Sequence, residues 1–288
     1  MRREFLIPAA KQPFFDGAVA CPLQVCVLAS GSRGNATYVS DGTTAVLIDA
    51  GLSGVEIQRR MAANGLSPNN LDAIIVSHEH TDHISGVGVL SRRFNLPVHI
   101  NDATHQACET ALGKLPAIFP FACGEPFAIG SLTLHPFSIS HDAQDPAGFT
   151  LSGQGMKVGI ATDLGVITEM IRVHLRGCHI LVLEANHDSQ MLMEGPYPWP
   201  LKQRIRGRCG HLSNEDTKNL VTDLFHDQLR HVVLAHLSEA NNTPEKALET
   251  VTPALSNTRT RLHVATQTHG SQCLTIFSDL PSSALSDE

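Results

Sequence analysis

The sequence predicts an α/β protein in which two packed β-sheets carry helices on their outer faces, a four-layer αββα sandwich. Short apolar runs with β propensity cluster in both halves of the chain, and amphipathic helical stretches separate them. A chain of 288 residues with 42% hydrophobic residues can bury a large core. Because only 5% of the residues are aromatic, that core must be mainly aliphatic, which suits layered sheets and helices.

In the first half of the chain, an irregular arm over residues 1–21 precedes a single domain over 22–288. A hairpin across Asp41-Gly42 joins two of its strands. Ser53 and Glu56 form a capping box for the first helix, and Asp102 caps the third. The expected strands are 23–30, 36–40, 43–49, 73–76 and 97–100, and the expected helices are 53–64, 86–94 and 103–112.

The second half of the chain is rich in strands at first and then alternates between strands and helices. Ser213 and Asp216 resemble a capping box, and Thr243 is the N-cap of a helix with Pro244 at its first position. The expected strands are 132–139, 147–152, 157–162, 180–184, 232–235 and 261–266, and the expected helices are 167–175, 213–225 and 243–255.

The overall charge and the cysteines limit the classes of protein to consider. A formal net charge of −7 excludes a uniformly basic nucleic-acid-binding surface, so any such contact must be local. Seven cysteines without a C-x-x-C pair argue against a disulfide framework or a zinc ribbon. No segment has the roughly 18 apolar residues of a membrane helix. We therefore expect a cytoplasmic protein that does not associate with membranes.

The strongest chemical signal is the segment His78-x-His80-x-Asp82-His83, directly after an apolar strand. Imidazole and carboxylate ligands suit zinc, manganese or iron, and this spacing can direct alternate side chains at two different ions. The alternative is a solvated histidine-rich loop. Four ligand-type residues within six positions favour metal binding.

The same segment, followed in order by Ser140-His141-Asp142, Ala161-Thr162-Asp163 and Ala235-His236-Leu237, resembles the metallo-β-lactamase superfamily from about residue 22 to 270. The resemblance implies the metallo-β-lactamase fold and two divalent metal ions, zinc or manganese first and iron also compatible. A hydroxide shared by the two ions would then act as the nucleophile of a hydrolase. The implied ligands are His78, His80 and His141 for one ion, Asp82, His83 and His236 for the other, and Asp163 as a bridge.

The stretch over 195–214 points to the substrate. It contains Tyr197, Trp199, Lys202 and Arg204, and its four basic residues are accompanied by no acidic residue. Basic side chains can follow phosphates while aromatic rings stack on bases. The alternative is a proline-stiffened loop with a solvated basic face.

The segment Gly210-His211-Leu212-Ser213 resembles the His-x-Ser/Thr segment that precedes a helix in RNase Z-like and RNase J-like nucleases of this superfamily. The resemblance implies that His211 contacts the scissile phosphate or protonates the leaving group, so His211 and Asp82 are the candidate catalytic residues. Ser213 and Asn214 would bind phosphate at the helix N-terminus, and His187 is a further candidate for substrate binding.

Four segments, 31–37, 184–188, 195–204 and 235–238, resemble the YycJ (VicX) group of bacterial proteins, which is regarded as exonuclease-like and cytoplasmic. We therefore expect a phosphodiesterase or exonuclease that acts on nucleic acid. An acyl or thioester hydrolase of the glyoxalase II or lactamase type and a non-enzymatic metal-binding regulator are the alternatives. Metal identity, DNA or RNA, end polarity, exonuclease or endonuclease action, oligomeric state and the role of residues 1–21 stay open.

Overall fold

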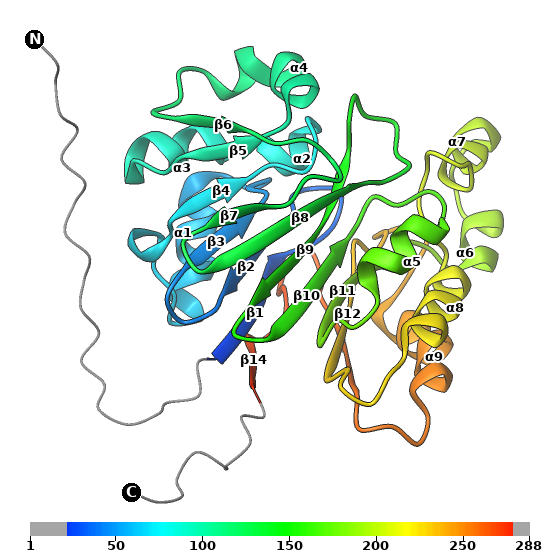
Figure 1. The fold of residues 1–288 in the computed structure, drawn as a ribbon. Coiled ribbons are helices and arrows are strands. Elements are labelled where there is room, and N and C mark those ends of the chain that lie inside the picture. The colour runs from blue at the N-terminus through cyan, green and yellow to red at the C-terminus, as the bar shows by residue number, and fades with distance from the viewer. Residues whose placement is uncertain (1–21, 279–288) are drawn as a thin grey trace, which may run out of the picture.

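A computed structural model describes residues 22–278, so the expected arm over residues 1–21 lies outside the described residues. Two seven-stranded sheets pack against each other, with helices on the outer face of each (Figure 1). The αββα sandwich is therefore confirmed.

The first sheet has the strand order β14-β1-β2-β3-β4-β5-β6. Strands β3 to β6 run parallel, whereas β1 pairs antiparallel with both β2 and β14. The strands are β1 (Pro22–Ala29), β2 (Ala36–Ser40), β3 (Ala45–Ile48), β4 (Ala73–Ile75), β5 (Val98–Ile100), β6 (Ile118–Pro120) and β14 (Leu274–Phe277).

The second sheet has the order β13-β12-β11-β10-β9-β8-β7, and its strands β10 to β13 run parallel. Each sheet therefore combines a parallel half with an antiparallel half. The strands are β7 (Phe127–Ile129), β8 (Leu132–Ser138), β9 (Ala147–Gly153), β10 (Met156–Ala161), β11 (Ile180–Glu184), β12 (His231–Ala235) and β13 (Arg261–Val264).

Three apolar clusters hold the layers together. One lies between the sheets and includes Val25, Ile75 and Phe149, and the other two lie beneath the outer helices. The helices beside the first sheet are α1 (Gly54–Ala63), α2 (Thr81–Ile84), α3 (Val87–Phe94) and α4 (Asp102–Leu112), with the 3-10 turn η1 (Pro68–Asn70). Those of the second half are α5 (Glu169–Leu175), α6 (Ser189–Glu194), α7 (Trp199–Ile205), α8 (Asn214–Leu224) and α9 (Pro244–Val251), with η2 (Thr252–Leu255).

Two expected helix caps differ from the structure. The N-cap of α4 is Asn101, whose side chain accepts a hydrogen bond from the Thr104 amide, and Asp102 is already helical. At α1, Ser53 caps the Glu56 amide as expected, but the Glu56 carboxylate pairs with arginines on its own helix. The capping box is therefore only half formed, because ion pairs compete for Glu56. The capping box between Ser213 and Asp216 at α8 is confirmed.

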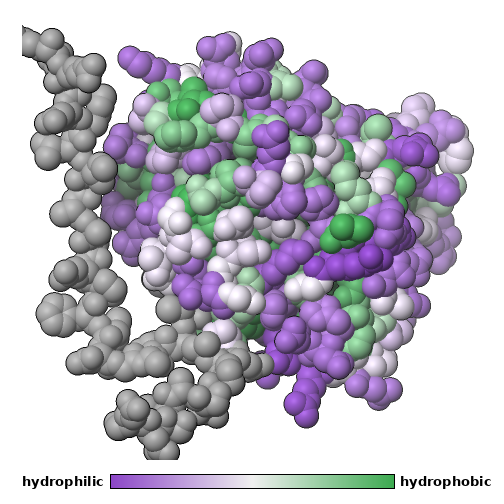
Figure 2. All heavy atoms as spheres, viewed as in Figure 1, coloured by the Kyte–Doolittle hydropathy of each residue, from purple (hydrophilic) through white to green (hydrophobic). Residues whose placement is uncertain are grey.

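The surface seen in Figure 2 is largely polar, with apolar side chains in scattered patches. Among residues 22–278, no helix has both the length and the apolar character needed to cross a bilayer. The basic stretch over 195–214 is not a simple loop, because α7 forms within it.

Candidate active site

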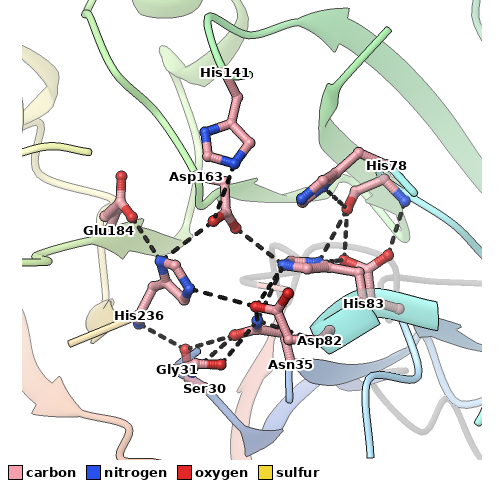
Figure 3. A network of polar contacts seen from close by, with 12 residues as sticks. Ser30, Gly31, Asn35, His78, Asp82, His83, His141, Asp163, Glu184 and His236 are labelled. Atoms are coloured by element: carbon pink, nitrogen blue, oxygen red, sulfur yellow. Dashed lines mark hydrogen bonds and ion pairs between the residues drawn. The ribbon is translucent and has the colours of Figure 1, made fainter. Parts of the chain in front are cut away.

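The candidate site lies where the carboxyl ends of parallel strands from the two sheets approach each other. His78 follows β4, Asp163 follows β10 and His236 follows β12. His141 enters from the segment after β8, and Figure 3 shows the four side chains directed toward one centre. Ligand sites commonly form at the carboxyl ends of parallel strands. The topology thus brings together residues that are far apart in the sequence.

His78, His80 and His141 form one cluster. One potential ligand atom from each lies within 4.8 Å of the others, and their ring centroids are 4.7, 5.2 and 5.1 Å apart. Three imidazole rings whose nitrogen atoms point toward one centre do not stabilise one another. A cation between them would satisfy all three lone pairs.

A second cluster joins Asp82, His83 and His236, again with ligand atoms within 4.8 Å. Asp163 lies between the two clusters. Its carboxylate is 3.2 Å from His83 Nε2, 3.4 Å from His236 Nδ1 and 3.8 Å from His141 Nε2. All seven residues singled out as metal ligands in the sequence therefore converge in space.

Hydrogen bonds outside the two clusters orient the imidazoles. Asp49 Oδ2 lies 2.7 Å from His83 Nδ1, Ser77 Oγ lies 2.9 Å from His78 Nδ1, and the Gly210 carbonyl lies 3.4 Å from His141 Nδ1. When Nδ1 donates outward, Nε2 keeps its lone pair toward the centre, which is the arrangement of metal-bound histidines in proteins.

Glu184 at the end of β11 is fully buried and connects His236 of the second cluster with His211. Its Oε1 accepts hydrogen bonds from His236 Nδ1 at 2.7 Å and from His211 Nδ1 at 2.8 Å. Its Oε2 accepts from the amides of Leu164 and Leu212. Four donors on one carboxylate fix its position.

Sequence reasoning missed the roles of Glu184, Asp49 and Asn35. Asn35 Nδ2 lies 3.2 Å from Asp82 Oδ2 and 3.0 Å from His83 Nε2. A carboxylate at the end of an apolar strand was the available signal for Asp49 and Glu184. Nothing local to Asn35 indicates that it reaches the turn over 78–83.

The donor set fits divalent cations. His78 Nε2, His236 Nε2 and Asp163 Oδ2 are buried and have no hydrogen-bond partner within the described part of the chain. Buried polar atoms ordinarily have partners, and a bound ion would supply the missing one here. Mixed imidazole and carboxylate donors suit zinc, manganese or iron.

The pKa values show how strongly negative the site is. Burial alone would lower the pKa of His236, but the charge of Asp163, the nearby Asp82 carboxylate and the hydrogen bond to Glu184 raise it to about 10. Burial likewise opposes protonation of His83, yet Asp49 and Asp163 hold its pKa well above the usual range. Protons on these imidazoles thus offset the carboxylates, and a metal cation can take their place.

Asp49, Asp163 and His236 adopt left-handed backbone conformations, with φ values of 59°, 58° and 55°. Each lies just beyond the end of a strand, at β3, β10 and β12 respectively. For residues other than glycine this region costs about 1–2 kcal/mol. The conformation turns the chain sharply and directs each side chain into the site.

A cavity of about 320 Å³ opens beside the two clusters, and His211, Tyr197 and Arg204 line it. The His211 ring lies 5.2 Å from both the His141 and the His236 rings, measured between centroids. Arg204 forms an ion pair with Asp142, next to His141, and so ties α7 to the rim of the cavity.

The other expected substrate residues do not line this cavity. Lys202 is buried, and its ammonium group donates to the carbonyls at the end of α6, so it stabilises the α6–α7 connection. Asn214 is fully buried against Asn242, and Ser213 is engaged in its helix cap. Trp199 is 54% exposed on a neighbouring surface, and His187 is buried with Nδ1 unpaired among the described residues.

The αββα sandwich with histidine and carboxylate clusters at its strand ends defines the class of metal-dependent hydrolases. The profile described as "Beta-lactamase superfamily domain" matches residues 44–237. The chain therefore belongs to the β-lactamase superfamily.

Two curated relatives span most of the chain. Exodeoxyribonuclease YycJ of Bacillus anthracis is 38% identical over 235 residues, which cover 81% of this chain and 89% of that protein. Exodeoxyribonuclease WalJ of Streptococcus pneumoniae (strain D39) is 36% identical, covering 80% and 87%. Among solved structures, the metallo-β-lactamase fold protein YhfI of Bacillus subtilis has a TM-score of 0.71 and 17% identity, covering 88% of this chain and 99% of that one. This last likeness supports the fold.

Proposed function

We propose that this protein is a metal-dependent exonuclease that hydrolyses phosphodiester bonds in DNA. The observation that carries the proposal is the place of His211, which lines the cavity, is held by Glu184 through Nδ1, and lies 5.2 Å from both the His141 and the His236 rings. A hydrolase of neutral acyl substrates has less need of a second acid at this place. The exodeoxyribonuclease activity named for two relatives supports the same substrate.

In this proposal the two clusters hold two divalent ions, zinc or manganese with iron also compatible. His78, His80 and His141 would hold one ion, Asp82, His83 and His236 would hold the other, and Asp163, which lies between the two clusters, would contribute to both. Bound ions lower the pKa of water and offset negative charge on the attacked phosphate. Asp82 has a second task, because a carboxylate beside the attacking water can orient it.

His211 acts as the general acid. Burial opposes its protonation, but the charge of Glu184 and the hydrogen bond to it raise the pKa of His211 above its ordinary value. A larger fraction of His211 is therefore in the imidazolium form at neutral pH than for an ordinary histidine, and this form can protonate the departing oxygen. Because Glu184 holds Nδ1, the proton available for transfer is on Nε2.

The cavity beside His211 receives the end of the nucleic acid. Tyr197, just before α7, and Leu201 and Ile205 within α7 give the cavity an apolar wall that suits a base or sugar. Arg204 contributes positive charge at the rim, where it now pairs with Asp142. Trp199 lies farther out and provides a stacking surface for the next nucleotides.

A cytoplasmic location fits this substrate, and the cysteines among residues 22–278 are all free thiols.

The test uses protein loaded with zinc or manganese and the same strand supplied as 5′-labelled DNA, 3′-labelled DNA or RNA, with circular DNA as the endonuclease control. Release of mononucleotides from one labelled DNA end, with circular DNA left intact, is expected. His80→Ala should abolish hydrolysis, whereas His269→Ala, which changes an exposed histidine, should not.

The same samples separate the alternatives. Turnover of a thioester without turnover of DNA or bis-p-nitrophenyl phosphate would identify an acyl hydrolase. Full metal occupancy without turnover of any ester would identify a binding protein and refute the proposal.

A further inference from the structure

A pair of thiols lies far from the active site, on the outer face of the first sheet. Cys26 lies in β1, and Cys273 directly precedes β14. The two strands are antiparallel and pair Val25 with Leu274, so the next position along each strand brings Cys26 opposite Cys273. Facing residues on antiparallel strands have Cα atoms about 4.5–5.5 Å apart. This range falls within the separation that a disulfide spans, about 4.4–6.8 Å.

Side-chain placement agrees with the register. Cys26 is fully buried in the apolar cluster beneath α1, and Cys273 is half-buried and packs against the same cluster. Cys26 Sγ donates to the Ser271 carbonyl at 3.8 Å, and Cys273 Sγ donates to Asn64 Oδ1 at 3.9 Å. The interaction between the two neighbouring thiols raises the pKa of Cys26 and lowers that of Cys273. Cys273 is thus both the more accessible sulfur and the better nucleophile of the two.

We infer that Cys26 and Cys273 form a reversible redox pair that peroxide converts into a disulfide between β1 and β14. The Cys273 thiolate attacks hydrogen peroxide, forming an S–O bond, breaking the O–O bond and releasing hydroxide, which takes up a proton to become water. The Cys26 sulfur then attacks Cys273, forming the S–S bond and expelling a second water. Two thiols are oxidised and one peroxide is reduced.

The disulfide would restrain residues 265–272, which also contact the loop over residues 33–35 beside the active site. Residues 265–272 cross from β13 in the second sheet to β14 in the first. Within this segment Gln267 accepts a hydrogen bond from the Arg33 amide at 2.8 Å and donates to the Gly34 carbonyl at 3.0 Å. Asn35, the next residue, contacts His83. Fixing β14 therefore restrains the segment that supports this loop.

The test treats the full chain with hydrogen peroxide, alkylates the remaining thiols and maps peptides without reduction. The expected product joins the Cys26 and Cys273 peptides, two hydrogens lighter than their sum, and dithiothreitol reverses it. The oxidised protein should melt about 5 °C higher. Amides of residues 265–277 should exchange more slowly with deuterium.

Matched variants make the result specific. Cys273→Ser and Cys26→Ala should each abolish the cross-link, and Cys209→Ser, which removes an exposed thiol in the active-site cavity, should leave it intact. Oxidation of Cys273 to a sulfinic acid in the wild-type chain, with Cys26 remaining a free thiol, would overturn the inference. So would a fully reduced pair under conditions that oxidise Cys209.

Discussion

His211 and His236 share one oxygen atom of a buried carboxylate, since the Nδ1 atoms of both rings lie within 2.8 Å of Glu184 Oε1. One ring faces the substrate cavity and the other belongs to the ligand clusters. A single side chain therefore orients a proposed metal ligand and the proposed general acid together.

Replacing Glu184 by Gln should lower both metal affinity and nuclease activity by about 10- to 100-fold each, the usual effect of losing a partner of a metal-bound histidine. The amide keeps the shape but loses the charge that raises the pKa of His211 and His236. Metal content and kcat are the measurements. Glu169→Gln, at an exposed ion pair, serves as the control. Loss of activity with unchanged metal affinity would contradict the joint role.

Replacing His211 by Ala should lower kcat on DNA by roughly 10²–10⁴-fold, the contribution of a general acid. A substrate with a p-nitrophenolate leaving group needs little protonation, so its hydrolysis should fall much less. The basic limb of the DNA pH–rate profile, which reports loss of the acidic proton, should also disappear. Equal losses on both substrates would show that His211 binds phosphate instead.

Metal binding at pH 7 should release protons. The metal-free site holds protons on His83 and His236 because the neighbouring carboxylates raise both pKa values, and each imidazole must lose its proton to coordinate a cation. Affinity should therefore fall as the pH falls. Calorimetry in two buffers with different ionisation enthalpies measures the number of protons. Identical binding enthalpies in both buffers would rule out this linkage.

Replacing Tyr197 by Ala should raise KM for DNA several-fold and change kcat little, since the ring lines the cavity and belongs to neither candidate metal cluster. Turnover of bis-p-nitrophenyl phosphate, which is too small to need that wall, should be unchanged. Steady-state kinetics on both substrates provide the check, and a fall in kcat on both would place Tyr197 nearer the chemistry.

His231 should make the protein less stable in mild acid. Burial, together with His263 and Arg261, lowers its pKa from 6.5 to about 4. The unfolded chain therefore binds more protons between these values, and the free energy of unfolding falls as the pH falls from 6.5 to 4. Because the ring is half-exposed, the contribution is about 1 kcal/mol after solvent screening.

The corresponding test compares His231→Gln with His105→Gln by urea unfolding of chelator-treated protein at pH 7 and pH 4.5. The first variant should lose less stability on acidification than wild type, and the second should match wild type. Identical losses in all three proteins would refute the assignment.

Local patterns predicted much of the fold and part of the candidate ligand set. Strands and helices followed from apolar periodicity, and the cluster over 78–83 from its spacing, whereas His141, Asp163 and His236 followed from the family resemblance. In contrast, the groups that each polar side chain contacts depend on how the elements pack together. Lys202 carries a charge that suggested phosphate binding, yet its amine binds carbonyls of α6 that the chain order alone does not bring near. Glu184 and Asp49 acquire their roles only when two sheets meet.

The left-handed turns at Asp49, Asp163 and His236 have a consequence for substitution. Glycine would relieve the backbone cost at any of the three positions and simultaneously remove a side chain from the centre. Glycine would, however, leave the buried partners of these side chains unpaired, namely Ser77 and His83 beside Asp49 and Glu184 beside His236. Strain and hydrogen bonding therefore oppose each other at these turns, and the native side chains keep both the stability and the chemistry of the site.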